Sequence, residues 1–136
     1  MISKFKFKWR LATGYYSKGF KYLSDKDTTG YRVFYKTPEQ TLSEGGDCED
    51  WAILVYHRMT QDGRQNGVTF EHWKNIEPNK SGHMVLRLAN GKCISNHGSH
   101  GKTVRGYQYY KTVTIEEIND RINKHKQTGF KLEDNT

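Results

Sequence analysis

The stretch from residue 37 to residue 59 constrains the fold of this chain more than any other part of the sequence. The pair Gly45-Gly46 ends a short helical turn that starts at Pro38, and Asp47 then stands where the N-cap of a longer helix belongs. The apolar residues that follow have the i, i+3, i+4, i+7 spacing of a buried helix face: Ala52, Val55, Tyr56 and Met59. The sequence therefore predicts a central helix over 48–59 that begins at Cys48.

Downstream of this helix the pattern changes to short extended segments separated by turn residues. We expect strands over 68–73, 83–88, 92–96 and 104–113, with Asn90-Gly91 as a tight hairpin turn, and a further extended segment over 31–35. Thr114 is in position to cap a last helix over 115–124, and the polar tail over 127–136 is expected to fray. These elements predict one α+β domain over 1–136, in which the helix that carries Cys48 packs on an antiparallel sheet.

The first residues of the chain alternate basic side chains with aromatic or aliphatic ones. Over 4–11 the apolar residues fall at every second position, which is the period of a strand with one buried face. We therefore expect a half-buried strand whose outer face carries Lys4, Lys6, Lys8 and Arg10.

Composition limits the classes of protein to which the chain can belong. Its 136 residues include 22 Lys and Arg against 15 Asp and Glu, which is a formal net charge of +7, and its 13% aromatic residues argue against disorder of the whole chain. No run of 18 apolar residues and no signal-type apolar segment is present, so we expect a cytoplasmic protein that makes no membrane contact and keeps both cysteines reduced. The positive charge is compatible with an acidic protein partner or with nucleic acid.

Chemistry is indicated first by Cys48, which lies in the first turn of the predicted helix. The unpaired amides and the dipole at a helix N-terminus lower the pKa of a thiol, and the same amides can hold an oxyanion. His83 begins a predicted strand about 35 residues further on, and a cysteine and a histidine that are distant in sequence are the usual pair of a thiol hydrolase. The alternative is that Cys48 is a small core residue without a chemical role.

Three short segments around these residues form a longer pattern. Residues 37–42 read Thr-Pro-Glu-Gln-Thr-Leu, residues 46–52 read Gly-Asp-Cys-Glu-Asp-Trp-Ala, and residues 83–86 read His-Met-Val-Leu. The pattern resembles the bacterial transglutaminase-like cysteine proteinases, in which Thr-Pro-Glu-x-Thr-Leu leads through glycine into Gly-Asp-Cys-Glu-Asp, and a later strand starts with His-x-Val-Leu. The resemblance covers roughly residues 35–96. It implies a papain-like, transglutaminase-like core, with Cys48 as nucleophile and His83 as general base.

The sequence departs from this family at the third catalytic position. The family's aspartate lies in a Gly-x-x-hydrophobic-Asp-Asn segment, and residues 91–96 here place Ser95 at the aspartate and Asn96 beside it. Strand parity puts Ser95 on the face of His83, whereas chemistry favours Asn96, because an amide orients an imidazole better than a hydroxyl does. A bulge after Ser95 would bring Asn96 to His83, so both residues are candidates.

The same resemblance suggests roles for residues on either side of the nucleophile. Tyr35 stands two residues before the Thr-Pro, where the family often has tryptophan, so it is expected to line the site and to help hold an oxyanion. We interpret Asp47 and Asp50 as structural, the first as a helix cap and the second tied to a nearby backbone or basic group. No cofactor and no metal is expected.

Two other kinds of site compete with this hypothesis. A zinc-type group could form from Cys93, His97 and His100, with His83 or Cys48 as the fourth ligand. The predicted basic strand and a tyrosine-rich strand could together bind single-stranded nucleic acid through Tyr107, Tyr109 and Tyr110, although no nucleic-acid motif of defined spacing is present.

The sequence thus predicts thiol-dependent acyl chemistry on protein or peptide amides, through Cys48 and His83. Proteolysis, deamidation and transfer to an amine are all compatible with this chemistry. The alternative is a catalytically weak or inactive protein of the same fold, which would act as an interaction or inhibitor module for an acidic partner. The small, lysine- and tyrosine-rich composition resembles that of phage proteins.

Overall fold

The computed structural model describes residues 1–23, 35–124 and 126–133. The elements, in chain order, are α1 (Lys4–Ala12), the short 3-10 turn η1 (Tyr15–Ser17), α2 (Pro38–Glu44), α3 (Cys48–Gln61), β1 (Thr69–Asn75), β2 (His83–Arg87), β3 (Cys93–Ser95), β4 (Gly98–Ser99), β5 (Tyr107–Val113) and α4 (Ile115–Asn123). Of the extended segment expected over 31–35, only Tyr35 belongs to the described residues, and the last three residues of the tail lie outside them as well.

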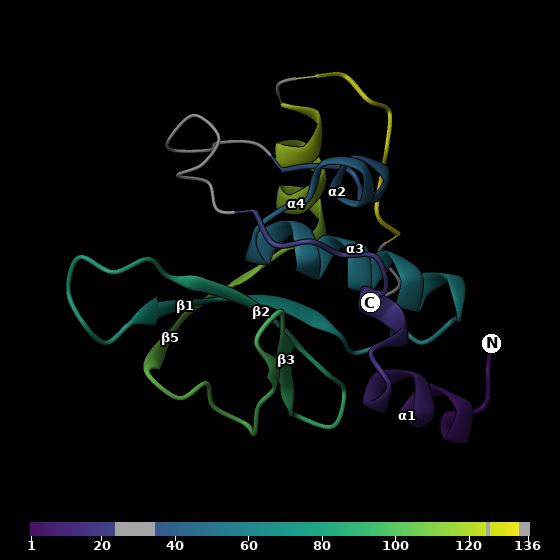
Figure 1. Cartoon of the computed structure of the whole chain (residues 1–136), viewed down its shortest axis with the longest axis horizontal. Helices are drawn as coiled ribbons and strands as arrows, with labels where there is room; N and C mark the ends of the chain where they lie inside the picture. The colour runs from purple at the N-terminus through teal and green to yellow at the C-terminus, as the bar shows by residue number, and fades with distance from the viewer. Residues whose placement is uncertain (24–34, 125, 134–136) are drawn as a thin grey trace.

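A five-stranded antiparallel sheet forms one layer of the molecule. Its strand order is β4-β3-β2-β1-β5, so the two strands that follow α3 in the chain lie at the centre of the sheet. Helix α3 lies along one face of the sheet, and α2 and α4 lie beyond it on the same side (Figure 1). The predicted α+β architecture, with the cysteine-bearing helix on an antiparallel sheet, is therefore confirmed.

The start of α3 is built as the sequence predicts. The Asp47 side chain accepts a hydrogen bond from the Asp50 amide at 3.3 Å, and the Asp50 carboxylate accepts one from the Asp47 amide at 3.2 Å. This reciprocal capping box satisfies two amides that have no partner within the helix. The helix continues two residues beyond Met59, the last residue of the predicted span, and buries a face of Ala52, Ile53, Leu54, Val55, Tyr56 and Met59.

The sheet has a different apolar cluster on each face. Towards α3, Phe70, Met84 and Leu86 join the main core together with the isoleucines of α4. On the opposite face a smaller cluster contains Trp73, Val85, Cys93 and Val104. Alternate residues of β2 therefore belong to different clusters, as the two-residue period of a strand requires.

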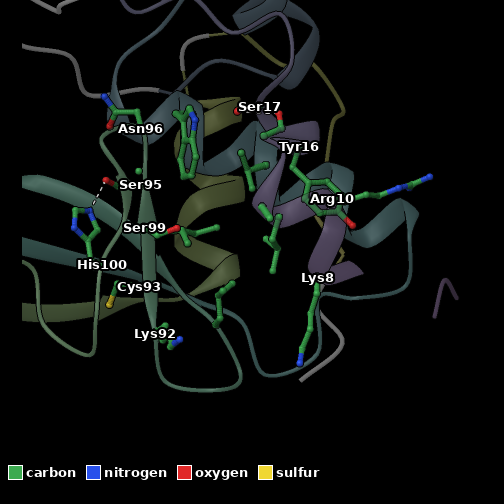
Figure 2. Close-up of a pocket in the computed structure, with 18 of the residues that line it drawn as sticks. Lys8, Arg10, Tyr16, Ser17, Lys92, Cys93, Ser95, Asn96, Ser99 and His100 are labelled. Atoms are coloured by element: carbon green, nitrogen blue, oxygen red, sulfur yellow. Dashed lines mark hydrogen bonds between the residues drawn. The ribbon is translucent and has the colours of Figure 1, made fainter. Parts of the chain in front are cut away.

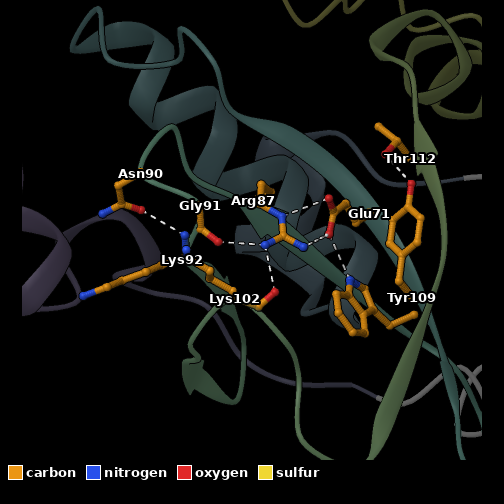
Figure 3. A network of polar contacts seen from close by, with 9 residues as sticks. Glu71, Arg87, Asn90, Gly91, Lys92, Lys102, Tyr109 and Thr112 are labelled. Carbon is orange, nitrogen blue, oxygen red and sulfur yellow. Dashed lines mark hydrogen bonds and ion pairs between the residues drawn. The ribbon is translucent and has the colours of Figure 1, made fainter.

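A polar network holds the second face of the sheet together (Figure 3). The Arg87 guanidinium donates to both carboxylate oxygens of Glu71, at 3.0 and 2.9 Å, and to the carbonyls of Gly91 and Lys102, at 2.7 and 2.8 Å. The indole nitrogen of Trp73 donates to the same Glu71 carboxylate at 3.0 Å. One arginine thus connects β1, β2, the hairpin turn and the loop before β5.

The basic strand expected over 4–11 is wrong, because these residues form the helix α1. Ser3 caps this helix by accepting a hydrogen bond from the Lys6 amide, and Phe7 and Leu11, one helical turn apart, pack against the core. An alternating sequence also contains apolar i, i+4 pairs, so its period is compatible with a helix. Contacts beyond the segment decide the outcome: Arg10 pairs with Asp62 at 2.6 Å, and the Ile2 amide donates to the Asp62 carbonyl at 3.0 Å.

The tail also differs from its expectation, since residues 127–133 are tied to the helices. The Asn123 side chain accepts hydrogen bonds from the amides of Thr128 and Gly129, and Asn119 accepts one from the Leu132 amide at 2.7 Å. The Leu132 side chain is 3% exposed within the main core. Burial of Leu132 in the core therefore holds the polar residues on either side of it in place.

Among the residues that the structure describes, none of the helices combines the length and the apolar character needed to span a bilayer.

Candidate active site

Cys48 lies where the start of α3 meets the start of β2. Its sulfur accepts a hydrogen bond from the Met84 amide at 3.4 Å, and its thiol donates to Glu49 Oε2 at 3.6 Å. Met84 follows His83 directly, so the sulfur lies beside the strand position from which the imidazole projects. Over the described part of the chain, no hydrogen bond joins the sulfur to the His83 ring.

The turn before Cys48 is held in place from three sides. The Gly46 amide and carbonyl pair with Lys21 and Leu23 at 3.0 and 2.8 Å, and the Lys36 ammonium donates to the Gly45 carbonyl at 2.7 Å. A Cβ atom at Gly46 would lie 2.5 Å from the Cβ of Asp50, so only glycine fits against the helix cap. These contacts position the nucleophile relative to β2.

Asp50 links this turn to the segment that precedes α2. It is fully buried, and its second carboxylate oxygen accepts the Lys36 amide at 3.0 Å. The predicted structural roles of Asp47, as a cap, and of Asp50, as a tie to nearby backbone, are confirmed.

The expectation of a lowered pKa for Cys48 is wrong. Burial raises the pKa of the Cys48 thiol well above its usual value, and the neighbouring Glu49 carboxylate raises it further. The hydrogen bond from the Met84 amide favours the thiolate but is the smaller effect. At this helix N-terminus, burial and an adjacent negative charge therefore outweigh the dipole.

His83 is buried on the second face of the sheet, with 5% of its surface exposed. Its ring stacks on His97, with centroids 4.4 Å apart and planes 13° apart, and lies 5.4 Å from the Tyr107 ring. Burial lowers the pKa of His83 to about 4, and the nearby imidazoles of His97 and His100 contribute. The Nε2 atom is buried and finds no hydrogen-bond partner among the residues that the structure describes.

The two candidates for the third position have different surroundings. Parity is as predicted, since Ser95 lies on the face shared by Val85 and Cys93, but its hydroxyl is engaged by the His97 amide at 3.1 Å and by His100 Nε2 at 2.8 Å (Figure 2). Asn96 lies in the two-residue turn between β3 and β4, and its side-chain oxygen is buried with no hydrogen-bond partner within the described ranges. No hydrogen bond connects either side chain to His83 in the described residues.

Tyr35 lies close to the nucleophile. The side chain is buried, and its pKa is raised, first by burial and then by the nearby carboxylates of Glu49 and Asp47. Its amide donates to the Arg121 carbonyl at 3.0 Å, which anchors the segment before α2 to α4.

Two groups at this site were not expected from the sequence. The Glu49 carboxylate accepts the hydrogen bond of the Cys48 thiol. Because Glu49 follows Cys48 directly in the sequence, its effect on the thiol pKa could have been predicted. His72 lies opposite Met84 in the β1–β2 register, on the α3 face, and its imidazole interacts with the Glu49 carboxylate. The sequence around His72 matches no motif, so its place near Glu49 became visible only from the pairing of β1 with β2.

The structure does not bring together the residues proposed for the zinc site or for the nucleic-acid site within its described ranges. No group of three or more His, Cys, Asp or Glu side chains among the described residues is placed to hold a metal ion, which covers the combination proposed around Cys93. The basic segment of α1 lies beside the β3–β4 edge, whereas the tyrosines of β5 lie at the opposite edge (Figure 1). The two described segments are therefore separated by the width of the sheet.

The comparisons with known proteins identify the fold. No protein-family model and no curated protein matches the chain. Three solved structures of Legionella pneumophila LapG are similar, each at 19% sequence identity. They are the calcium-bound form (TM-score 0.63, 84% of this chain and 67% of that one), LapG with no state specified (0.62, 83% and 65%) and the EGTA-treated form (0.61, 81% and 63%). The chain thus spans about two thirds of the length of these neighbours. It shares the transglutaminase-like α+β fold of these structures.

Proposed function

We propose that the protein carries out thiol-dependent acyl chemistry on protein or peptide amides, with Cys48 as nucleophile and His83 as base. The observation that carries the proposal is the position of the Cys48 sulfur, which is at the N-terminus of α3 and bonded to the amide that follows His83. The similarity of the fold to LapG supports it. Proteolysis, deamidation and transfer to an amine share this first step.

The protonation states suggest how the first step would proceed. The raised pKa of Cys48 and the lowered pKa of His83 leave both groups neutral near pH 7. The His83 ring lies on the second face of the sheet, against His97, so in the proposed step it would first turn towards the sulfur. It would then take the thiol proton while the sulfur attacks the amide carbon, and would return it to the departing amine. Water or a second amine would then release the acyl group from the sulfur.

Stabilisation of the oxyanion is assigned to the start of α3 and to Tyr35. The first amides of a helix have no partner within the helix and point to the position where the negative charge develops. We propose the Cys48 amide as one donor and the Tyr35 hydroxyl as the other. The raised pKa of Tyr35 keeps this hydroxyl protonated near pH 7.

Asn96 is the better candidate to orient His83. The Asn96 side-chain oxygen and His83 Nε2 are both buried without a hydrogen bond, one as an acceptor and the other as a possible N–H donor. His97, which stacks on His83, follows Asn96 directly in the β3–β4 turn. A bond between the two would satisfy both atoms and fix the tautomer that leaves Nδ1 free to accept the proton.

A non-catalytic interaction module is the second candidate. Two observations favour it. Among the described residues no carboxylate supports His83, since Ser95 stands at that position and is engaged by other groups, and Glu49 disfavours the thiolate. In that case the basic surface would bind an acidic protein partner while Cys48 remained a passive thiol.

Site-resolved alkylation of Cys48 distinguishes the two candidates. Iodoacetamide rates between pH 5 and pH 9 are measured by mass spectrometry for the wild-type protein and for His83→Ala, with Cys93 as the buried internal reference. If His83 is the base, its removal slows alkylation of Cys48 at least about tenfold near neutral pH, since general-base assistance contributes a factor of about 100 or more. Equal rates in both proteins support the interaction module instead. Transfer of an acyl group from a peptide pool to Cys48, detected as a mass adduct, is the matching positive result.

A further inference from the structure

A cavity of about 390 Å³ opens between the N-terminal segment and the β3–β4 edge of the sheet (Figure 2). One wall comes from α1 and η1, the other from β3, β4 and the turn between them, and residues of α3 line it as well. This volume lies within the range of about 300–1,000 Å³ that is usual for ligand pockets.

The cavity shares residues with the surroundings of the proposed active site. Trp51, which is one helical turn after Cys48 on α3, lines it, and so do Asn96 and Ser95 from the third catalytic position. These shared residues connect the cavity with the proposed nucleophile along α3 and with the third catalytic position along β3.

The lining is mainly apolar. Trp51, Val55, Leu88, Leu11 and Ile94 contribute to it, and the first three are almost fully buried. Such a surface stabilises an apolar side chain in proportion to the area removed from water.

Two lysines give the rim of the cavity an unbalanced positive charge. Lys8 of α1 and Lys92 of the β2–β3 turn both line it and are exposed, and in the described residues neither is paired with a carboxylate (Figure 2). Arg10 also lines the cavity, but Asp62 neutralises it at 2.6 Å. The free cations thus lie beside an apolar recess, which complements an apolar side chain flanked by carboxylates.

We propose that this cavity is a substrate subsite, which binds a bulky apolar side chain of the substrate polypeptide next to acidic residues. The inference rests on the proposed function, and it adds the substrate class: acidic segments that contain a leucine-like residue. Lys8 and Lys92 select the acidic flanks, and the lining selects the apolar residue.

Peptide binding to the ¹⁵N-labelled Cys48→Ala protein tests the subsite without turnover. Three blocked tripeptides are titrated at low salt: acetyl-Glu-Leu-Glu-amide, acetyl-Lys-Leu-Lys-amide and acetyl-Glu-Ser-Glu-amide. We expect saturable shifts of the Trp51 indole and of the Ile94 and Ser99 amides, with the first peptide binding about tenfold more tightly than the other two. Its preference over the lysine peptide should shrink as salt is added.

Lys8→Glu and Lys4→Glu form a matched pair of variants. Both reverse an exposed charge on α1, but only Lys8 lines the cavity. Lys8→Glu should weaken binding of the acidic peptide about threefold to fivefold, with Lys4→Glu close to the parent protein. Equal effects of the two variants, equal affinity for the three peptides, or shifts that map away from the cavity would overturn the inference.

The result is separable from the test of the proposed function. In one outcome, the acidic peptide binds as expected while Cys48 is alkylated at the same rate in the wild-type protein and in His83→Ala. In that case the catalytic proposal fails and the cavity remains a peptide-binding site. If alkylation depends on His83 and none of the peptides binds, only the subsite is rejected.

Discussion

Glu49 adds to the effect of burial on the resting state of the nucleophile. Its carboxylate accepts the Cys48 thiol at 3.6 Å and stabilises the protonated form of the sulfur. A negative charge in contact with a nucleophile opposes formation of a second negative charge there. The acidic residue that belongs to the sequence motif therefore works against the helix dipole.

We predict that Glu49→Gln lowers the pKa of Cys48 and accelerates its alkylation at pH 7. A fall of one in the pKa corresponds to about tenfold more thiolate, and this is the expected order of the effect. The rate is measured by mass spectrometry at Cys48 across the pH range. Glu39→Gln removes a carboxylate from the first turn of α2 and serves as the control; a similar acceleration there would contradict the assignment to Glu49.

We predict that His83 makes the free energy of unfolding decrease as the pH falls below about 6.5. Its pKa is lowered to about 4 in the folded protein, against about 6.5 in the unfolded chain, so the unfolded state binds more protons between these values. Stability is therefore lost as the pH falls from about 6.5 towards 4, and the full difference corresponds to about 3 kcal/mol.

This expectation is checked by urea unfolding at pH 7 and pH 4.5. The wild-type protein should lose about 2 kcal/mol more than His83→Gln on acidification. His57, His72 and His100, whose pKa values are also lowered by burial, are present in both proteins, so their contribution cancels. Parallel losses in the two proteins would show that His83 is not buried in the neutral form.

At the scale of elements, the ion pair between Arg87 and Glu71 links two strands and two loops that no sequence motif connects. Arg87 holds both oxygens of Glu71 and two loop carbonyls, and Glu71 is almost fully buried (Figure 3). The loop that it ties down precedes β5 and follows the segment of His97 and His100. The network therefore fixes the chain segment that leads from these histidines towards β5.

Arg87→Ala should destabilise the protein by about 2 to 4 kcal/mol, because a buried carboxylate and two carbonyls lose their donor. The free energy of unfolding in urea is the readout. Lys80→Ala is the matched control, since Lys80 pairs with Glu77 at 2.9 Å with both side chains more than half exposed, and its cost should stay below about 0.5 kcal/mol. The double variant Glu71→Gln with Arg87→Met should recover part of the loss; similar losses for Arg87→Ala and Lys80→Ala would contradict a buried network.

At the scale of the whole molecule, the ends of the described chain close onto the core. The Tyr56 hydroxyl of α3 donates to the Glu133 carbonyl at 3.1 Å, and Arg64 donates to the Ile2 carbonyl at 2.8 and 3.0 Å. Segments at the two ends of the sequence thus support α3, which carries the nucleophile. The tail belongs to the folded unit up to Glu133.

We expect Leu132→Ala to cost about 2 to 3 kcal/mol of unfolding free energy, the usual loss for a buried leucine. The adjacent, exposed Lys131→Ala should change stability by less than about 0.5 kcal/mol. Chemical denaturation of both variants measures the difference. A neutral Leu132→Ala would mean that the tail frays in solution, as its polar composition predicts.

The parts of the site that were predictable from sequence depend on local interactions. The cap at Asp47, the break at Gly45-Gly46 and the helix that follows need only backbone amides, short polar side chains and a helical period. The position of His83 at the start of a strand was accessible for the same reason. The parity of Ser95 followed from the two-residue period of a strand, and the structure confirms it.

The remaining features depend on groups that are far apart in the sequence. Residues 4–11 fit two periods, and contacts with Asp62 and the core select the helix. The direction of the Cys48 pKa shift follows from burial, which no local pattern reports, together with the charge of Glu49. Likewise, the hydroxyl of Ser95 has a partner in His100 only because β3 and β4 fold back on each other. The sequence by itself determined the elements and the chemical types at the site, whereas the tertiary structure decided their environment, because desolvation and pairing arise only once distant segments are packed together.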